Sequence, residues 1–150
     1  MYEDILVPTD GSRAADAAIE HAVTLADRFD ATLHALYVVD STAYSSLDAG
    51  SQIVSEALGR EGEDAVDRIA ASGTDADVPV VESVVSGTPF RSILEYADRE
   101  GIDLITMGTH GRTGIDRYLL GSVSERVVRS ANQPVLTVRL REDEEGSAPE

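Results

Sequence analysis

The chain has 150 residues, 42% of them hydrophobic, and no cysteine, which predicts one globular domain without disulfides or thiolate metal sites. Acidic residues outnumber basic ones 28 to 12, for a formal net charge of −16, and this disfavours nucleic acid and anionic lipid as partners. All the bases are arginine, so mechanisms that need a lysine are excluded, and the composition resembles that of proteins from salt-loving microbes. No apolar run approaches the roughly 20 residues of a membrane helix and no signal peptide is recognisable, so we expect a cytoplasmic protein without membrane insertion.

Short apolar runs alternate with helical periodicities along the chain, which predicts a parallel sheet covered by helices. The predicted strands are residues 5–7, 33–39, 78–85, 104–107 and 135–140. The predicted helices begin at residues 12, 51, 88 and 122. The second, over 51–71, has an apolar stripe that includes Ile53, Ala57, Ala65 and Ile69, but Gly59 and Gly62 weaken it. With right-handed crossovers, the simplest arrangement is an open five-stranded sheet in the order 3-2-1-4-5 with helices on both faces. We expect the domain to span residues 1–140, with a loop at 40–50 and an acidic, disordered tail at 141–150.

In an open α/β sheet, ligands bind outside the carboxyl ends of the strands, where the strand order reverses. In the predicted order, this position lies between the turn at residues 8–11 and the glycine-rich stretch at residues 107–114. Glycine lets the backbone approach a phosphate closely, and the first N–H groups of a helix bind anions. We therefore predict a phosphate site in the second loop, formed by Gly108, Gly111, Arg112, Gly121, Ser122, Val123 and Ser124.

Structural interpretations of the same residues stay open. Ser122 and Glu125 fit a capping box that would satisfy the helix start without any ligand. Asp10 fits a turn acid as well as a ligand-binding residue. His110 is interpreted as a loop residue that orients its turn, and the scattered His21 and His34 do not suggest a metal site.

The spacing Gly108-x2-Gly111-x9-Gly121-Ser122 resembles the phosphate loop of the nucleotide-binding branch of the universal stress protein family. Residues 5–12 resemble that family's first strand and turn, and residues 132–138 resemble its closing strand. The similarity runs from about residue 1 to 140, and only residues 40–75 lack family landmarks. The resemblance implies the Rossmann-like fold of the adenine nucleotide alpha hydrolase type.

The resemblance further implies ATP, or AMP or ADP, bound with Mg²⁺ or Mn²⁺. The glycines, Ser122, Val123 and Ser124 would hold the phosphates. Asp10 would lie near the ribose and the nucleotide-bound metal ion, and Pro8 and Thr9 would line the base or sugar. Val38 would meet the adenine through its backbone, and Met107 would pack near the base or sugar.

Together these patterns predict an ATP-binding regulatory module of the stress-response type with no catalytic residue. Two alternatives stay open: a slow ATPase or phosphotransferase that uses Asp10 or His110, and a nucleotide-free structural dimer or adaptor. The predicted last strand, residues 135–140, is a long apolar sheet edge, which invites pairing with a second copy. We therefore expect a homodimer through this strand.

Overall fold

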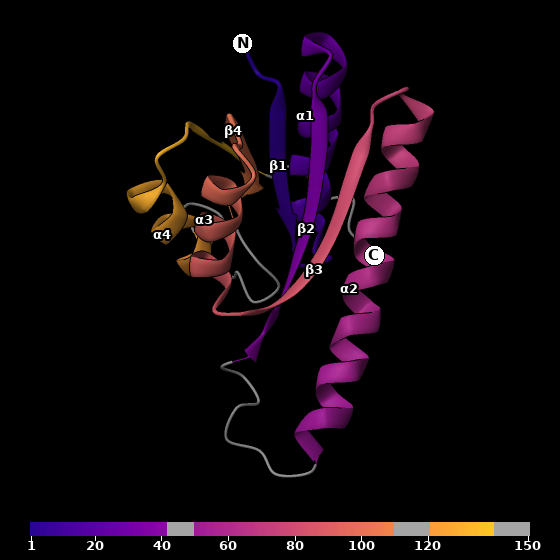
Figure 1. The fold of residues 1–150 in the computed structure, drawn as a ribbon, viewed down its shortest axis with the longest axis vertical. Coiled ribbons are helices and arrows are strands. Elements are labelled where there is room, and N and C mark those ends of the chain that lie inside the picture. Colours follow the sequence, from indigo (N-terminus) through magenta and orange to yellow (C-terminus); the bar gives the residue numbers. More distant parts are fainter. Residues whose placement is uncertain (42–49, 110–120, 140–150) are drawn as a thin grey trace, which may run out of the picture.

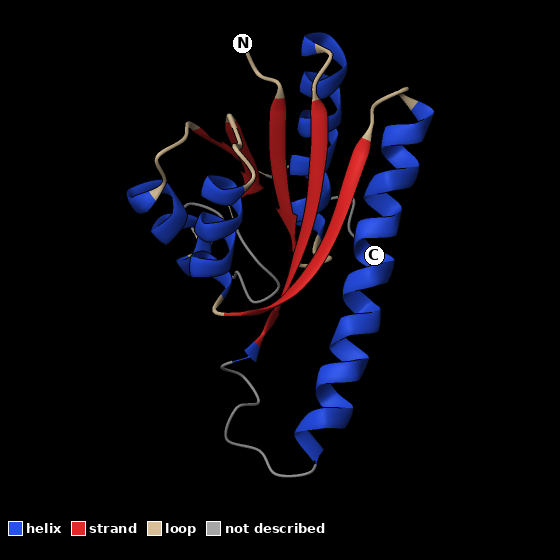
Figure 2. Cartoon of the chain, viewed as in Figure 1, coloured by secondary structure: helices blue, strands red, loops and turns tan. Residues whose placement is uncertain are grey.

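The computed structural model describes residues 1–41, 50–109 and 121–139 and contains a five-stranded parallel sheet. The sheet order is β3-β2-β1-β4-β5, which confirms the predicted order (Figures 1 and 2). Among these residues, no helix is long and apolar enough to cross a membrane. The elements in chain order are β1 Asp4–Thr9, α1 Arg13–Phe29, β2 Thr32–Asp40, α2 Gly50–Asp75, β3 Val80–Gly87, α3 Pro89–Arg99, β4 Leu104–Gly108, α4 Ser122–Ser130 and β5 Val135–Val138.

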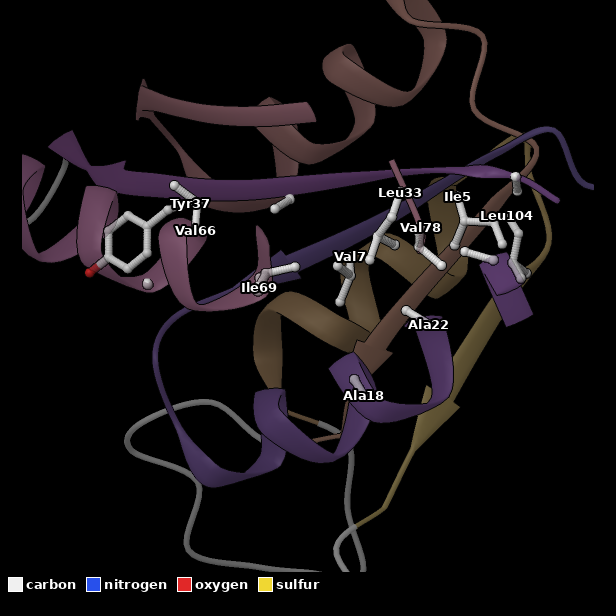
Figure 3. Close-up of a cluster of buried hydrophobic side chains, with 14 of the residues drawn as sticks. Ile5, Val7, Ala18, Ala22, Leu33, Tyr37, Val66, Ile69, Val78 and Leu104 are labelled. Atoms are coloured by element: carbon white, nitrogen blue, oxygen red, sulfur yellow. The ribbon is translucent and has the colours of Figure 1, made fainter. Parts of the chain in front are cut away.

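Two hydrophobic clusters lie on opposite faces of the sheet. Side chains of α1 and α2 pack with Ile5, Leu33 and Leu104 on one face (Figure 3). Side chains of α3 and α4 pack with Leu6 and Ile105 on the other. Because neighbouring strand residues point to opposite faces, strands covered on both sides become continuous apolar runs, as the sequence of β1 shows.

Helix α1 lies close to the sheet because its buried stripe consists of small residues. The stripe comprises Ala14, Ala15, Ala18, Ala22 and Ala26. Ser12 is the N-cap, and its side chain accepts a hydrogen bond from the Ala15 N–H at 3.2 Å. Phe29, at the last position, is 41% exposed and makes an edge contact with Tyr2 instead of entering the core.

Helix α2 runs through both glycines that were expected to weaken it. A Cβ at Gly62 would lie 2.6 Å from the ring of Tyr37, so this glycine makes room for a buried aromatic side chain. The predicted apolar stripe is correct for Ala65 and Ile69, which are 3% and 1% exposed, but wrong for Ala57, which is exposed, and for Ile53, which is 71% exposed. Figure 1 gives the reason: the first turns of α2 extend past the ends of the strands.

The strand boundaries differ from those predicted by one or two residues, and three of these differences bear on the fold. β1 does not break at Pro8 but continues to Thr9, and β3 begins at Val80 because Asp77 adopts a left-handed conformation (φ 59°) just before it. β5 ends at Val138, so the sheet edge is shorter than expected. Most of the predicted 40–50 loop, Leu140 and the predicted tail lie outside the described residues.

Candidate functional site

The sheet opens between β1 and β4 at its carboxyl end. β1 pairs with β2 along six residues, but with β4 only at Ile5 and Leu6. The rest of β4 pairs with β5, as in Gly108 opposite Val138. This opening lies at the reversal of strand order, where open α/β sheets bind ligands. The predicted position of the site is therefore a real discontinuity in the strand pairing.

Pro8 stands at this opening, which explains a proline in a central strand. The backbone N–H and C=O groups of even-numbered residues in β1 point toward β4. This direction follows from the Asp4 carbonyl, which accepts the Asp103 N–H at 2.8 Å. Proline usually removes a ladder hydrogen bond in a sheet interior. At Pro8 the missing N–H is on the β4 side, beyond the last pair of these two strands, Leu6 with Ile105. No ladder bond is lost there, and the strand continues.

The turn that follows β1 is held by its own side chains. The Thr9 hydroxyl accepts the Gly11 N–H at 3.0 Å, and an Asp10 carboxylate oxygen accepts the Ser12 N–H at 2.9 Å. Gly11 has a φ of 80°, a region that favours glycine. Thr9 is 8% exposed and Asp10 is half-buried. Asp10 is therefore a turn acid in this structure, with its carboxylate at the mouth of the opening.

Val38 presents backbone groups to the same opening from the other side. The backbone N–H and C=O groups of even-numbered residues in β2 point toward β1. This direction follows from the Thr32 N–H, which donates to the Glu3 carbonyl at 2.9 Å. Pairing of β2 with β1 ends at Tyr37, opposite Thr9, whereas β2 continues to Asp40 against β3. The Val38 carbonyl therefore points past the end of β1. Its side chain packs partly against the α3 face of the core.

The start of α4 completes the opening from the β4 side. The N-cap is Gly121, with no side-chain cap, so the capping box predicted from Ser122 and Glu125 does not form. The N–H groups of Ser122, Val123 and Ser124 occupy the first turn, which has no intrahelical acceptors. The Ser124 hydroxyl is buried and donates to the Gly108 carbonyl at 2.7 Å. In this geometry the hydroxyl proton is engaged, so the N–H is the group through which Ser124 can donate to a ligand.

Gly108 and Met107 both have structural roles that the sequence did not reveal. A Cβ at Gly108 would lie 2.7 Å from the Ala14 carbonyl oxygen and 2.8 Å from its carbon, so the end of β4 touches the α1 backbone. Met107 is 5% exposed and belongs to the core cluster on the α3 face. Both residues fix the base of the opening. Gly111, Arg112 and His110 lie outside the described residues.

A second polar cluster lies at the opposite end of the sheet. His34 is 6% exposed, and its Nε2 lies 2.9 Å from an Asp4 carboxylate oxygen while its Nδ1 lies 2.7 Å from the Tyr96 hydroxyl. Burial raises the pKa of the Tyr96 phenol, and a hydrogen bond with Ser83 opposes that rise. Sequence patterns did not reveal this cluster, because its members are far apart in the chain. Within the described part of the chain, no group of three or more His, Asp or Glu side chains could hold a metal ion.

An open parallel sheet split at its reversal of strand order, with a helix N-terminus and two turns at the split, defines an α/β protein of the Rossmann-like class. Residues 1–139 match the universal stress protein family. The chain therefore belongs to the universal stress protein family.

Relatives and solved structures agree with this assignment. Universal stress protein MJ0531 of Methanocaldococcus jannaschii is 41% identical over 141 residues, covering 93% of this chain and 83% of that protein. The solved structure of MJ0577 from the same organism has a TM-score of 0.83 at 32% identity, covering 95% of this chain and 99% of that one. A universal stress protein in complex with cAMP has a TM-score of 0.64 at 30% identity, covering 92% and 97%.

Proposed function

We propose that this protein is a cytoplasmic, adenine nucleotide-binding regulatory protein of the stress-response type, with ATP at the opening between β1 and β4. The observation that carries the proposal is the convergence of three kinds of backbone group on one opening. These are the N–H groups at the start of α4, the Val38 carbonyl and the turn at residues 9–12. A relative with a similar fold was solved with cAMP, which supports the same class of ligand.

The phosphates are assigned to the start of α4. The N–H groups of the first turn lie at the positive end of the helix dipole. They point in the same direction, so together they can donate hydrogen bonds to several phosphate oxygens. Gly121 has φ −65° and ψ 160°, an extended conformation that other residues also adopt. The backbone conformation therefore does not require glycine at this position. We infer that glycine is used because a side chain would occupy the space beside the helix start.

The adenine is assigned to the β2 side of the opening. The 6-amino group of adenine is a hydrogen-bond donor, and the Val38 carbonyl is an acceptor that faces the opening. Pro8 and Thr9, both buried at the end of β1, would form the floor beneath the sugar. Met107 lies deeper in the core, so its part is to support this floor.

We expect a divalent ion at this site only when it is bound to the phosphates of the nucleotide. The described residues supply no metal cage of their own, and Asp10 already accepts the Ser12 N–H with one carboxylate oxygen. Mg²⁺ commonly binds to one or two carboxylates, phosphates and water. Asp10 would supply a carboxylate ligand, and the phosphates would supply others.

Replacing Gly121 with valine tests the phosphate assignment. We expect Gly121→Val to abolish ATP binding in isothermal titration calorimetry while the thermal unfolding profile stays close to that of the wild type. The extended backbone at Gly121 accepts valine, but the new Cβ substituents would stand beside the N–H groups of the first turn.

The matched control is Gly59→Val, where a Cβ would meet nothing within 4 Å on α2. This variant should bind ATP as the wild type does. Unchanged ATP affinity in Gly121→Val would refute the phosphate assignment.

Catalysis is the alternative function, and turnover decides it. The chain has no lysine, and Asp10 is engaged in its turn, so we expect phosphate release far below the roughly 1–100 s⁻¹ of kinases. A coupled phosphate assay with Asp10→Ala as the control measures this. Release in the kinase range that disappears in Asp10→Ala would make the protein an enzyme.

A homodimer through β5 is the second part of the proposal. β5 is an edge strand. The backbone groups of its even-numbered residues point toward β4, since the Val138 carbonyl accepts the Thr109 N–H at 3.1 Å. The backbone groups of Val135 and Thr137 therefore face outward. On α4, Val128 is 43% exposed and lies about 200° around the helix from Arg126, which packs toward α3. An apolar side chain thus accompanies the open edge.

Thr137→Pro removes one outward donor without touching the β4 ladder. We expect light scattering to show a dimer of the wild type that tightens as salt rises, since screening of the −16 charge shortens to roughly 3 Å at 1 M. Thr137→Pro should be monomeric. Glu82→Pro, which places a proline on an outward position of the other edge strand, β3, should leave the dimer intact. A dimer that tolerates Thr137→Pro would exclude pairing through β5.

A further inference from the structure

The α3–α4 surface differs in charge from the rest of this acidic protein. α1 carries three acidic residues and two arginines, and α2 carries six and two. α3 carries two of each, and α4 carries one acidic residue and two arginines. Because α3 and α4 cover the same sheet face, that face is close to neutral or positive while the opposite face is acidic.

Two of these arginines lie close to the same aromatic ring. The Arg126 guanidinium carbon lies 4.8 Å from the centre of the Phe90 ring, and that of Arg91 lies 5.7 Å from it. Both distances are within the range of cation–π attraction. Phe90 therefore joins α3 to α4 through their arginines, and we call Phe90, Arg91 and Arg126 the arginine surface.

The two guanidiniums of the arginine surface have no carboxylate partner among the described residues. Their neighbours on the same helices do: Arg129 pairs with Glu125 at 2.9 Å, and Arg99 pairs with Glu100 at 3.2 Å. Arg91 and Arg126 are both exposed. In a chain with 28 acidic residues, an exposed pair of arginines that forms no ion pair with a described carboxylate is a surface suited to an acidic segment.

The chain itself contains such a segment. Residues 142–145 read Glu-Asp-Glu-Glu and begin three residues after Arg139, the last described residue beyond β5. The end of β5 is joined to the start of α4 through Thr109, whose N–H donates to Val138 and whose carbonyl accepts the Gly121 N–H. Three extended residues span about 10 Å, and Arg126 lies about 7 Å along the helix axis from Gly121. The four residues of the acidic run add about 13 Å when extended, so its later residues have the length to cross the Thr109 link and reach Arg126.

We propose that the acidic run at residues 142–145 docks within the same chain on the arginine surface. The other described helical face repels it, because α1 and α2 carry mostly acids. Attachment to β5 keeps the run at a high effective concentration near α4. Exposed ion pairs are screened by salt, so docking weakens as ionic strength rises and the arginine surface is uncovered at high salt.

A spin label measures this directly in the full chain. The sequence contains no cysteine, so Ser147→Cys gives one attachment site. At 0.1 M salt, the amide NMR signals around Arg91 and Arg126 should lose at least about half their intensity, and they should recover it above 1 M, where the screening length is roughly 3 Å.

Charge variants separate docking from nonspecific proximity. Arg91→Gln with Arg126→Gln should restore the signals at 0.1 M, whereas Arg28→Gln with Arg68→Gln, which removes two charges from the opposite face, should not. Signal loss centred on α1 or α2, or unaffected by the Arg91 and Arg126 changes, would overturn the proposal. Signal loss on an unlabelled chain mixed with labelled chain would assign the run to a second copy and also overturn docking within one chain.

Discussion

Gly108→Ala should lower the free energy of unfolding by about 2–3 kcal/mol, the upper part of the usual range for overpacking. The new methyl group would lie 2.7 and 2.8 Å from backbone atoms of Ala14. Backbone cannot rotate away as a side chain can, so either the end of β4 or the start of α1 has to move. For a chain of this size, we expect a melting temperature lower by roughly 4–12 °C.

Gly59→Ala is the matched control for this change. A Cβ at Gly59 meets nothing within 4 Å, and alanine is favoured over glycine inside a helix by up to about 1 kcal/mol. Thermal and urea unfolding should therefore show a small gain for Gly59→Ala and a large loss for Gly108→Ala. A Gly108→Ala protein as stable as the wild type would mean that this glycine has no packing role.

Tyr96→Phe should lower the free energy of unfolding by about 1–3 kcal/mol at pH 7, the cost of leaving a buried polar atom without a partner. The Asp4 carboxylate only accepts hydrogen bonds, so His34 Nε2 carries the proton that faces it. In the neutral ring, Nδ1 is then an acceptor, and the Tyr96 hydroxyl donates to it at 2.7 Å. Phenylalanine keeps the ring but leaves Nδ1 without this donor.

The same substitution has a pH signature. Burial raises the pKa of Tyr96 above its ordinary value, and the Ser83 hydrogen bond opposes this only in part. Above about pH 10, tyrosine in the unfolded chain loses its proton first, so the unfolded state binds fewer protons and stability falls. Tyr96→Phe lacks this loss, and its deficit relative to the wild type should shrink as pH rises past 10.

Urea unfolding at pH 7 and above pH 10 measures both effects. Tyr2→Phe is the control, because the Tyr2 hydroxyl has no partner among the described residues and its ring contact with Phe29 is kept. It should change stability by less than about 0.5 kcal/mol. An equal effect of the two substitutions would show that the His34–Tyr96 contact does not stabilise the fold.

Sequence patterns were sufficient for the sheet order, because each buried strand is a short apolar run and each helix has its own periodicity. They were also sufficient for the position of the opening, since reversal of the strand order follows from that topology. Helix α2 shows where periodicity fails: Ile53 continues the apolar stripe but is 71% exposed, in the first turn of a helix whose start extends past the ends of the strands.

Roles that depend on distant partners could not be read from the sequence. His34 and Tyr96 are 62 residues apart, and neither lies in a recognisable motif. The Gly108 contact is made with α1, so its glycine resembled a ligand-binding residue in the sequence. Ser122 matched a capping box, but the helix takes Gly121 as its N-cap, and the Gly121 N–H is bound to the Thr109 carbonyl, 12 residues earlier in the chain.

Adenine nucleotide binding at the opening between β1 and β4 is tested most directly by amide NMR of the full chain titrated with ATP and Mg²⁺. We predict saturable shifts concentrated at the turn after β1, residues 9–12, at residues 38–40 of β2, and at the first turn of α4, residues 122–124. Gly121→Val should remove these shifts. No shifts at saturating ATP, or shifts confined to α2 or to the arginine surface, would contradict nucleotide binding at this opening.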